Sequence, residues 1–206
     1  MSRSPWLVIA FSIFLLFSLS SMASAQSTRG LFQQNNDPII GNPQGKVTIA
    51  EFFDYQCSYC VAMASVLHKT VDNNPVVRIV VKQYPIKGRI SEIAARAALA
   101  ANKQGQFNRL NQALMAHSHQ LSEAMIMQLA RNVGLNMQRL QRDMYSSATT
   151  RQLQMNRTLA KSIGIAVTPS FVIGKTSMQH LTQENVFIGS LSQYELQKII
   201  RQFEQA

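Results

Sequence analysis

The sequence contains only two cysteines among its 206 residues, Cys57 and Cys60. Small secreted domains that depend on disulfides for stability carry more cysteines than this, so that class of protein is excluded. A disulfide between these two residues would close a very short loop, and the stabilisation from a disulfide grows with loop size. A purely structural bridge is therefore the weaker interpretation of the pair.

Soft metal ligands are also scarce. Besides the cysteines, the sequence offers only four histidines, which are His68, His117, His119 and His180. A tetrahedral zinc site would need two of them to join Cys57 and Cys60, and none forms a tight ligand cluster with that pair. We therefore expect no metal site, and no cofactor.

Acidic residues are few, since 10 Asp and Glu stand against 20 Lys and Arg and give a formal charge of +10. A charge of this size can indicate nucleic-acid binding. The basic residues are scattered, however, without a run of Lys and Arg or interleaved aromatic residues. We expect no nucleic-acid partner, and a solvated basic surface with some attraction to acidic partners or anionic membranes.

The N-terminus has the pattern of a secretory signal peptide. One positive charge, Arg3, precedes the apolar run of residues 6–19, and Ala23-Ser24-Ala25 follows it. These are the charged, apolar and small-residue parts of such a peptide. We expect residues 1–25 to be cleaved and the rest exported, with an uncleaved membrane anchor as the alternative because the run approaches spanning length. A lipid-modified N-terminus is not indicated, because no cysteine follows the run.

The segment that carries chemistry runs from Glu51 to Cys60. It follows the β-type residues 46–50 and precedes residues 61–67, which have helix-forming composition. A strand that enters a helix here places Cys57 at the helix N-terminus, where unpaired N–H groups and peptide dipoles favour a thiolate. Cys60 lies one turn deeper on the same side. The pattern predicts thiol–disulfide exchange, with two inert buried cysteines as the alternative.

Hydrophobic periodicity predicts an α/β domain over residues 47–206, preceded by a flexible N-terminal arm over residues 26–46. Strand, helix and strand at 47–53, 58–71 and 76–81 form a βαβ unit. Helices are then expected at residues 91–101, with Ser91 as N-cap, and at 107–116, 122–133, 137–144 and 149–163. Strands at 169–173 and 185–188 and an amphipathic helix at 192–203 complete the domain.

Four segments resemble the DsbA-like periplasmic thiol:disulfide oxidoreductases, a branch of the thioredoxin superfamily. They are residues 41–60, 80–85, 91–100 and 165–174, and the likeness covers nearly everything after Asp37. The resemblance implies a thioredoxin fold of order β-α-β, helices, β-β-α, in which a helical insertion at about residues 90–163 separates the two units.

The resemblance also implies a set of site residues. Cys57 would be the nucleophile, Cys60 the resolving cysteine, and Glu51 a buried acid that relays the proton of Cys60. Thr168 and Pro169 match the cis-proline loop, where the backbone of Thr168 would pair with an extended substrate. Ser58 and Tyr59 complete the predicted substrate-binding residues, and Asp54 and Lys82 are assigned to the surface or to supporting positions, without a role.

The dipeptide between the cysteines bears on the direction of the reaction. Strongly oxidising members of the family have Pro-His there, whereas this chain has Ser58-Tyr59. Without an imidazole donor the Cys57 thiolate loses one stabilising contact, so we expect a lower reduction potential. This dipeptide leaves oxidase and isomerase close together. We expect disulfide formation, with a disulfide isomerase or reductase of the same fold as the alternative. A redox-inert chaperone or binding module is the alternative of another class.

The resemblance implies a cellular setting as well. The substrates would be unfolded or partly folded exported proteins in the periplasm of a Gram-negative bacterium. A membrane partner would reoxidise the pair of an oxidase or reduce that of an isomerase. We expect a monomer.

Overall fold

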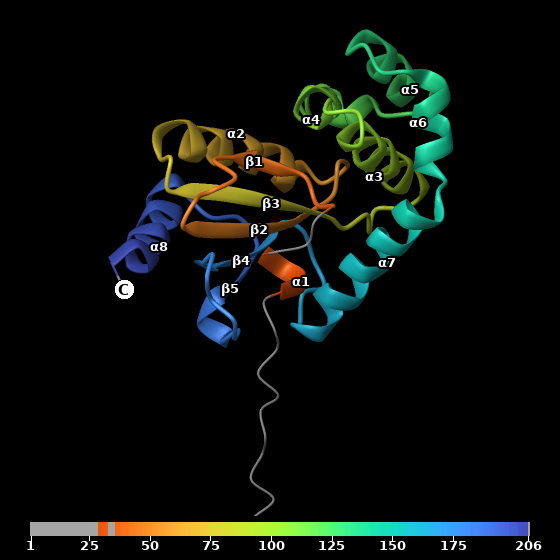
Figure 1. The fold of residues 1–206 in the computed structure, drawn as a ribbon. Coiled ribbons are helices and arrows are strands. Elements are labelled where there is room, and N and C mark those ends of the chain that lie inside the picture. The colour runs from red at the N-terminus through yellow and green to blue at the C-terminus, as the bar shows by residue number, and fades with distance from the viewer. Residues whose placement is uncertain (1–28, 33–35, 206) are drawn as a thin grey trace, which may run out of the picture.

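The computed structural model describes residues 29–32 and 36–205 (Figure 1). Within them, five strands form one sheet in the order β1-β3-β2-β4-β5. The strands are β1 Ile39–Gly41, β2 Val47–Phe53, β3 Val77–Gln83, β4 Ser170–Lys175 and β5 Val186–Ile188. β2 and β3 are parallel, and the other neighbouring pairs are antiparallel. The predicted signal peptide, residues 1–25, lies outside the described residues.

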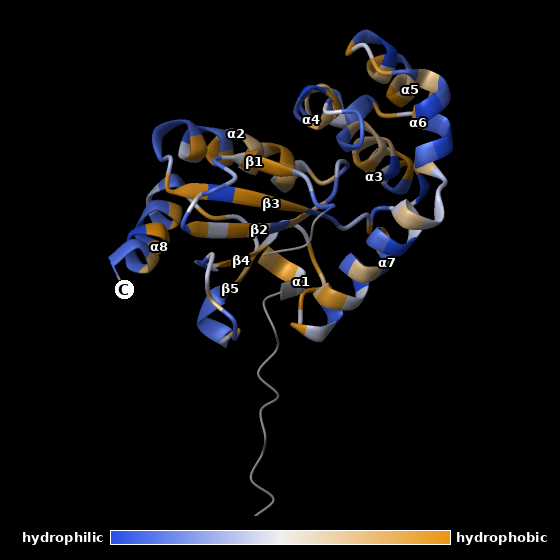
Figure 2. Ribbon diagram, in the orientation of Figure 1, coloured by the Kyte–Doolittle hydropathy of each residue, from blue (hydrophilic) through white to orange (hydrophobic). Residues whose placement is uncertain are grey.

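The central strand β2 is buried over its whole length because both faces of the sheet are covered. Its side chains alternate between two hydrophobic clusters, as the pleat of a strand requires. Val47, Ile49 and Phe53 join the cluster that contains residues of α2 (Ser58–Asn73) and α8 (Gln193–Gln205). Ala50 and Phe52 join the cluster that contains residues of α1 (Arg29–Phe32) and α7 (Ser147–Ser162). Figure 2 shows the hydrophobic residues along β2 and β3.

Helices cover the sheet and form a block beside it (Figure 1). The helices of the described residues are α1 Arg29–Phe32, α2 Ser58–Asn73, α3 Arg89–Asn102, α4 Phe107–Ala116, α5 Glu123–Asn132, α6 Met137–Met144, α7 Ser147–Ser162 and α8 Gln193–Gln205, with short 3₁₀ helices η1 Ser118–Gln120 and η2 Gln183–Asn185. Side-chain caps fix three starts in the block: Ser122, Asn136 and Ser146 each accept a hydrogen bond from a backbone N–H three residues on.

The observed order confirms the predicted fold class. The unit β2-α2-β3 comes first, the helices α3 to α7 follow, and β4, β5 and α8 complete the chain. The helical insertion therefore occupies residues 89–162, between the two parts of the sheet. This arrangement places the β2–α2 connection, with Cys57, next to the loop that enters β4, and Cys60 follows in the first turn of α2.

The N-terminal region differs from the flexible arm predicted for residues 26–46. Leu31 and Phe32 are 0% and 1% exposed in the second cluster, and β1 pairs with β3. Lys82, expected at the surface or in a supporting position, is fully buried, and it pairs with Asp37 and donates to the Gly30 carbonyl at 2.6 Å. The prediction of a flexible arm was based on the polar composition of the segment, which does not show that a few of its residues are buried against the sheet.

The start of α3 also differs from the prediction, because Ser91 is not its N-cap. The helix begins at Arg89, after Gly88, whose φ of 106° is a conformation that glycine adopts at little cost. Ser91 lies inside the first turn, is buried, and donates a hydrogen bond to Gln56 Oε1 at 3.1 Å. Ser91 therefore ties α3 to the residue that precedes Cys57.

Candidate active site

Cys57 is the residue immediately before α2, and its backbone is extended, with φ −92° and ψ 111°. Its N–H donates to the Asp54 carbonyl, and its own carbonyl accepts the first helical bond from Val61, both at 3.1 Å. Both cysteines are free thiols, 4% exposed at Cys57 and 0% at Cys60. The pair therefore has an outer and an inner thiol, with the outer one at the positive end of a helix dipole.

The loop before β4 lies against the outer thiol. The Cys57 thiol donates to the Thr168 carbonyl at 3.2 Å, and the Thr168–Pro169 peptide bond is cis. The hydroxyl of Thr168 is buried, with no hydrogen-bond partner among the described residues. Exposed apolar side chains flank this contact, since Tyr59 is 68% and Val167 49% exposed.

Cys60 sits in surroundings that favour the neutral thiol. Burial raises its pKa well above the usual range for cysteine, and the neighbouring charge of Glu51 and a hydrogen bond with Cys57 raise it further. A hydrogen bond from the backbone of Asp54 opposes these effects in part. If the two cysteines form a disulfide, the inner sulfur must therefore gain a proton when that bond is broken.

Glu51 lies in the middle of β2, opposite Val81 of β3 and Phe171 of β4. It is 5% exposed, and its Oε1 atom has no hydrogen-bond partner among the described residues. Burial raises the pKa of this carboxyl to about 8. Glu51 is thus largely protonated at neutral pH, in the same buried region as the Cys60 thiol whose pKa it influences.

A buried polar group that the sequence did not reveal supports this region. The Tyr55 hydroxyl donates to Asn111 Oδ1 of α4 at 2.9 Å and accepts from Gln83 Nε2 of β3 at 3.4 Å. The Tyr55 carbonyl accepts from the Ser118 hydroxyl at 2.5 Å. Tyr55 is 0% exposed, and burial raises the pKa of its hydroxyl. These bonds connect the β2–α2 connection to β3, α4 and η1.

Asp54 has a positioning role that the sequence did not indicate. Its side chain is 1% exposed rather than at the surface, because the carboxylate accepts three backbone hydrogen bonds. One oxygen accepts from Gln56 at 2.8 Å, and the other accepts from Ile86 at 2.7 Å and Lys87 at 2.9 Å. The short Asp54–Gln56 spacing of an Asx turn was the available signal. Asp54 thereby joins the cysteine-bearing loop to the loop before α3.

The structure brings most of the predicted site residues together at the carboxyl end of β2. Cys57 contacts Thr168 of the cis-proline loop, and Glu51 is near enough to Cys60 for its charge to raise the pKa of that thiol. Ser58 and Tyr59 are exposed next to Cys57 in the first turn of α2. No group of three His, Cys, Asp or Glu side chains suited to a metal occurs within the described residues.

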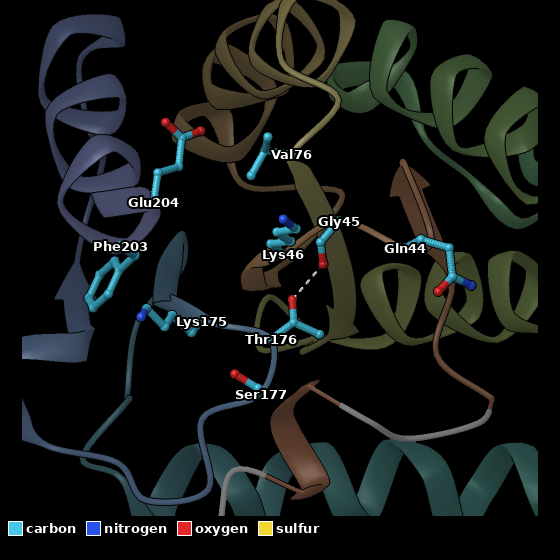
Figure 3. A pocket seen from close by; sticks show the side chains of 9 residues that line it. All are labelled: Gln44, Gly45, Lys46, Val76, Lys175, Thr176, Ser177, Phe203 and Glu204. Atoms are coloured by element: carbon cyan, nitrogen blue, oxygen red, sulfur yellow. Dashed lines mark hydrogen bonds between the residues drawn. The ribbon is translucent and has the colours of Figure 1, made fainter. Parts of the chain in front are cut away.

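A hollow of the surface lies at the opposite end of β2 from Cys57 (Figure 3). Its volume is about 710 Å³, and it is lined by residues 44–46, Val76, residues 175–177, Phe203 and Glu204. It contains none of the predicted site residues. Among the described helices, none combines the length and hydrophobicity needed to span a bilayer.

Comparison with known proteins assigns this arrangement to a family. A family model described as Thioredoxin matches residues 33–199. A thioredoxin-like oxidoreductase from Silicibacter pomeroyi DSS-3 is 38% identical, with a TM-score of 0.79, and the match covers 86% of this chain and 98% of that one. The catalytic domain of Proteus mirabilis ScsC is 26% identical, with a TM-score of 0.75 and coverage of 86% and 94%. A periplasmic thioredoxin-like protein from Salmonella enterica serovar Typhimurium is 25% identical, with a TM-score of 0.73 and coverage of 86% and 95%.

The curated proteins that match the sequence are named as Na(+)/H(+) antiporters rather than as oxidoreductases. The Na(+)/H(+) antiporter NhaA 3 of Salinispora tropica is 23% identical over 180 residues, which are 84% of this chain and 28% of that protein. The Na(+)/H(+) antiporter NhaA of Herminiimonas arsenicoxydans is 28% identical over 138 residues, which are 66% of this chain and 22% of that protein. The chain thus spans about a quarter of the length of these relatives, and ion transport is not assigned to it.

Proposed function

The chain belongs to the thioredoxin family, and on that premise we propose that it is a thiol:disulfide oxidoreductase that forms disulfides in exported proteins. Thiol–disulfide exchange is the activity that its similarity to the oxidoreductase of Silicibacter pomeroyi supports. The observation that carries the proposal is the unequal pair, with Cys57 at the start of α2 against the Thr168 carbonyl and Cys60 fully buried behind it.

The unequal pair determines the order of events. In the oxidised protein a substrate thiolate attacks the Cys57 sulfur, the Cys57–Cys60 bond breaks, and Cys60 leaves with the bonding electrons. Because burial raises the pKa of Cys60, it takes up a proton, for which protonated Glu51 is the neighbouring donor. A second substrate thiolate then attacks the substrate sulfur of the mixed disulfide and displaces Cys57. Two electrons have passed from the substrate dithiol to the pair.

The mixed disulfide would lie along the cis-proline loop. Thr168 is half-buried, and its carbonyl already receives the Cys57 thiol at 3.2 Å in the reduced protein. An extended substrate placed beside this loop can pair with its backbone, which gives affinity without demanding a particular sequence. The exposed rings and methyl groups of Tyr59 and Val167 suit the apolar segments of unfolded proteins.

The same arrangement of the two cysteines can also catalyse the exchange in the other direction. As an isomerase or reductase, the protein would start reduced, and Cys57 would attack a wrong disulfide of the substrate. Similarity to periplasmic proteins such as that of Salmonella supports a place outside the cytoplasm, and we propose the periplasm of a Gram-negative bacterium. A membrane redox partner would then restore the active form of the pair, and the protein would act as a monomer.

The test is a disulfide-forming assay with purified protein lacking residues 1–25. The oxidised protein is mixed with reduced, unfolded ribonuclease A, and substrate disulfides are counted by alkylation and mass spectrometry. We expect stoichiometric transfer by the wild type and a loss of at least a hundredfold in rate for Cys57→Ser. Cys60→Ser cannot form the Cys57–Cys60 disulfide, so it should transfer no disulfide to the substrate.

A second substrate separates the directions. Scrambled ribonuclease A regains activity only if its wrong disulfides are reshuffled, so recovery with the reduced protein, and no transfer with the oxidised protein, would assign the isomerase activity instead. If Cys57→Ser still prevented aggregation of an unfolded client as well as the wild type did, and neither form exchanged disulfides, the protein would be a redox-inert chaperone.

A further inference from the structure

Glu51 faces a small cavity between the sheet and the helices α2 and α4. The cavity has a volume of about 10 Å³, on the order of the space that one water molecule needs. Three polar residues line it, Glu51, His68 and Asn111, and its other walls are apolar. A water molecule in a protein interior needs two to four polar partners, and these side chains can provide them.

The cavity lies against one face of α2. Cys60, Ala64 and His68 are spaced four residues apart, so they follow one face of the helix. Cys60 is 0% exposed, whereas His68 is half-buried and reaches the solvent. Ala64 stands between them and lines the cavity, and its single methyl group leaves the space open. The face therefore leads from the inner thiol to the surface.

His68 is the only ionisable side chain besides Glu51 that lines this cavity in the described part of the chain. The other elements contribute Ile40 from β1, Phe53 from β2, Ile79 and Val81 from β3, and Asn111 and Met115 from α4. Along α2 itself, the exposed Lys69 and Asp72 flank His68 in the sequence, and neither lines the cavity.

We propose that His68 is a positioning residue that passes protons between the solvent and Glu51, through one water molecule held in the cavity. The proposal rests on the function given above, because it concerns the proton that Cys60 takes up. It explains how a carboxyl in the middle of a buried strand, with Oε1 unpaired within the described residues, can be reloaded for each turnover. An imidazole is suited to the task because it can accept a proton at one ring nitrogen and donate one from the other.

Each transfer balances. When the disulfide opens, Cys60 leaves as a thiolate with the bonding electron pair and takes the proton of Glu51. The Glu51 carboxylate takes a proton from the water, and the water takes one from the His68 imidazolium. The neutral imidazole is then protonated from the solvent. When a partner reoxidises the pair, the proton of Cys60 leaves by the reverse sequence.

The experiment uses the oxidised protein lacking residues 1–25. It measures the rate at which excess dithiothreitol reduces the Cys57–Cys60 disulfide between pH 5 and 9, by rapid acid quench and alkylation. In His68→Ala we expect the single-turnover rate at pH 7 to fall by at least about tenfold, on the order of a modest general acid–base contribution. Imidazole added to the buffer should restore most of the loss, because it can enter the space left by the ring. His117→Ala, which removes a half-buried histidine that does not line the cavity, is the matched control and should react like the wild type.

Ala64→Val tests the water molecule separately, because the added methyl groups occupy the cavity while His68 is unchanged. It should be as slow as His68→Ala, and imidazole should not restore it. The proposal is overturned if His68→Ala reacts within twofold of the wild type across the pH range, or if its loss persists in imidazole, which would indicate a merely structural role. Failure of the proposed function would show in the wild type itself, as a pair that does not exchange at any pH.

Discussion

Replacement of Glu51 by Gln should stabilise the reduced protein at alkaline pH. Burial raises the pKa of this carboxyl from 4.5 to about 8, so the folded state holds a proton that the unfolded state releases. Below about pH 4.5, Glu51 is protonated in both states and does not change the free energy of unfolding. Between about pH 4.5 and 8 the wild type loses stability, and above about pH 8 the loss is constant. At about 1.36 kcal/mol for each pH unit, buried Glu51 costs the folded state about 3 kcal/mol at pH 7, where it must hold a proton, and at most about 5 kcal/mol above pH 8, where it is ionised. Gln cannot ionise and escapes this cost.

The assay is urea unfolding of the dithiol form at pH 4.5, 7 and 9, followed by circular dichroism because the only tryptophan, Trp6, lies in the predicted signal peptide. The difference between Glu51→Gln and the wild type should grow with pH by several kcal/mol. Glu184→Gln, at an exposed carboxylate, controls for general charge and should show a difference that does not change with pH. A constant difference for Glu51→Gln would refute the assignment of Glu51 as a protonated buried acid.

Three further predictions concern neighbouring groups. Asp37→Ala removes the charge that neutralises buried Lys82 and should lower the free energy of unfolding by about 3–5 kcal/mol. The double variant Asp37→Leu, Lys82→Met should recover most of this loss. An unchanged stability of Asp37→Ala would contradict the pairing. Asp54→Ala leaves three backbone N–H groups without their acceptor and should cost about 2–4 kcal/mol in the same assay, whereas a cost under about 0.5 kcal/mol would show that solvent replaces it. Iodoacetamide at pH 7 should modify Cys57 well before Cys60, because Cys60 is fully buried and its pKa is raised; equal rates by mass spectrometry would exclude the outer and inner roles.

Strong periodic patterns were enough to predict much of the fold. The strand at Val47–Phe53 and the helices at Phe107–Ala116 and Met137–Met144 have the predicted bounds, because their apolar residues follow a single period between clear breaks. The fold order followed from these segments. The cis bond at Thr168–Pro169 came from the resemblance alone, since an X-Pro bond is usually trans.

The parts that sequence reasoning missed depend on contacts between distant segments. Strand β1 has only three residues, Ile39–Gly41, and is defined by its pairing with β3. The role of Asp54 depends on backbone groups at Ile86 and Lys87. Lys82 lies just past the strand predicted at residues 76–81, whereas β3 extends to Gln83. A lysine buried in such a strand requires an anionic partner, but the shorter predicted strand left Lys82 outside it. Nothing in the sequence identified Asp37 as that partner.

The reduction potential of the Cys57–Cys60 pair tests the central claim most directly. The mature protein is equilibrated with mixtures of reduced and oxidised glutathione, and the fraction of dithiol is read by alkylation. We predict one two-electron transition between about −120 and −270 mV, the range that thioredoxin-fold relatives span. A value toward −120 mV would favour disulfide formation, and one below about −200 mV would favour isomerase or reductase activity. A pair that stayed reduced, or oxidised, at every glutathione ratio would contradict thiol–disulfide exchange as the function of this protein.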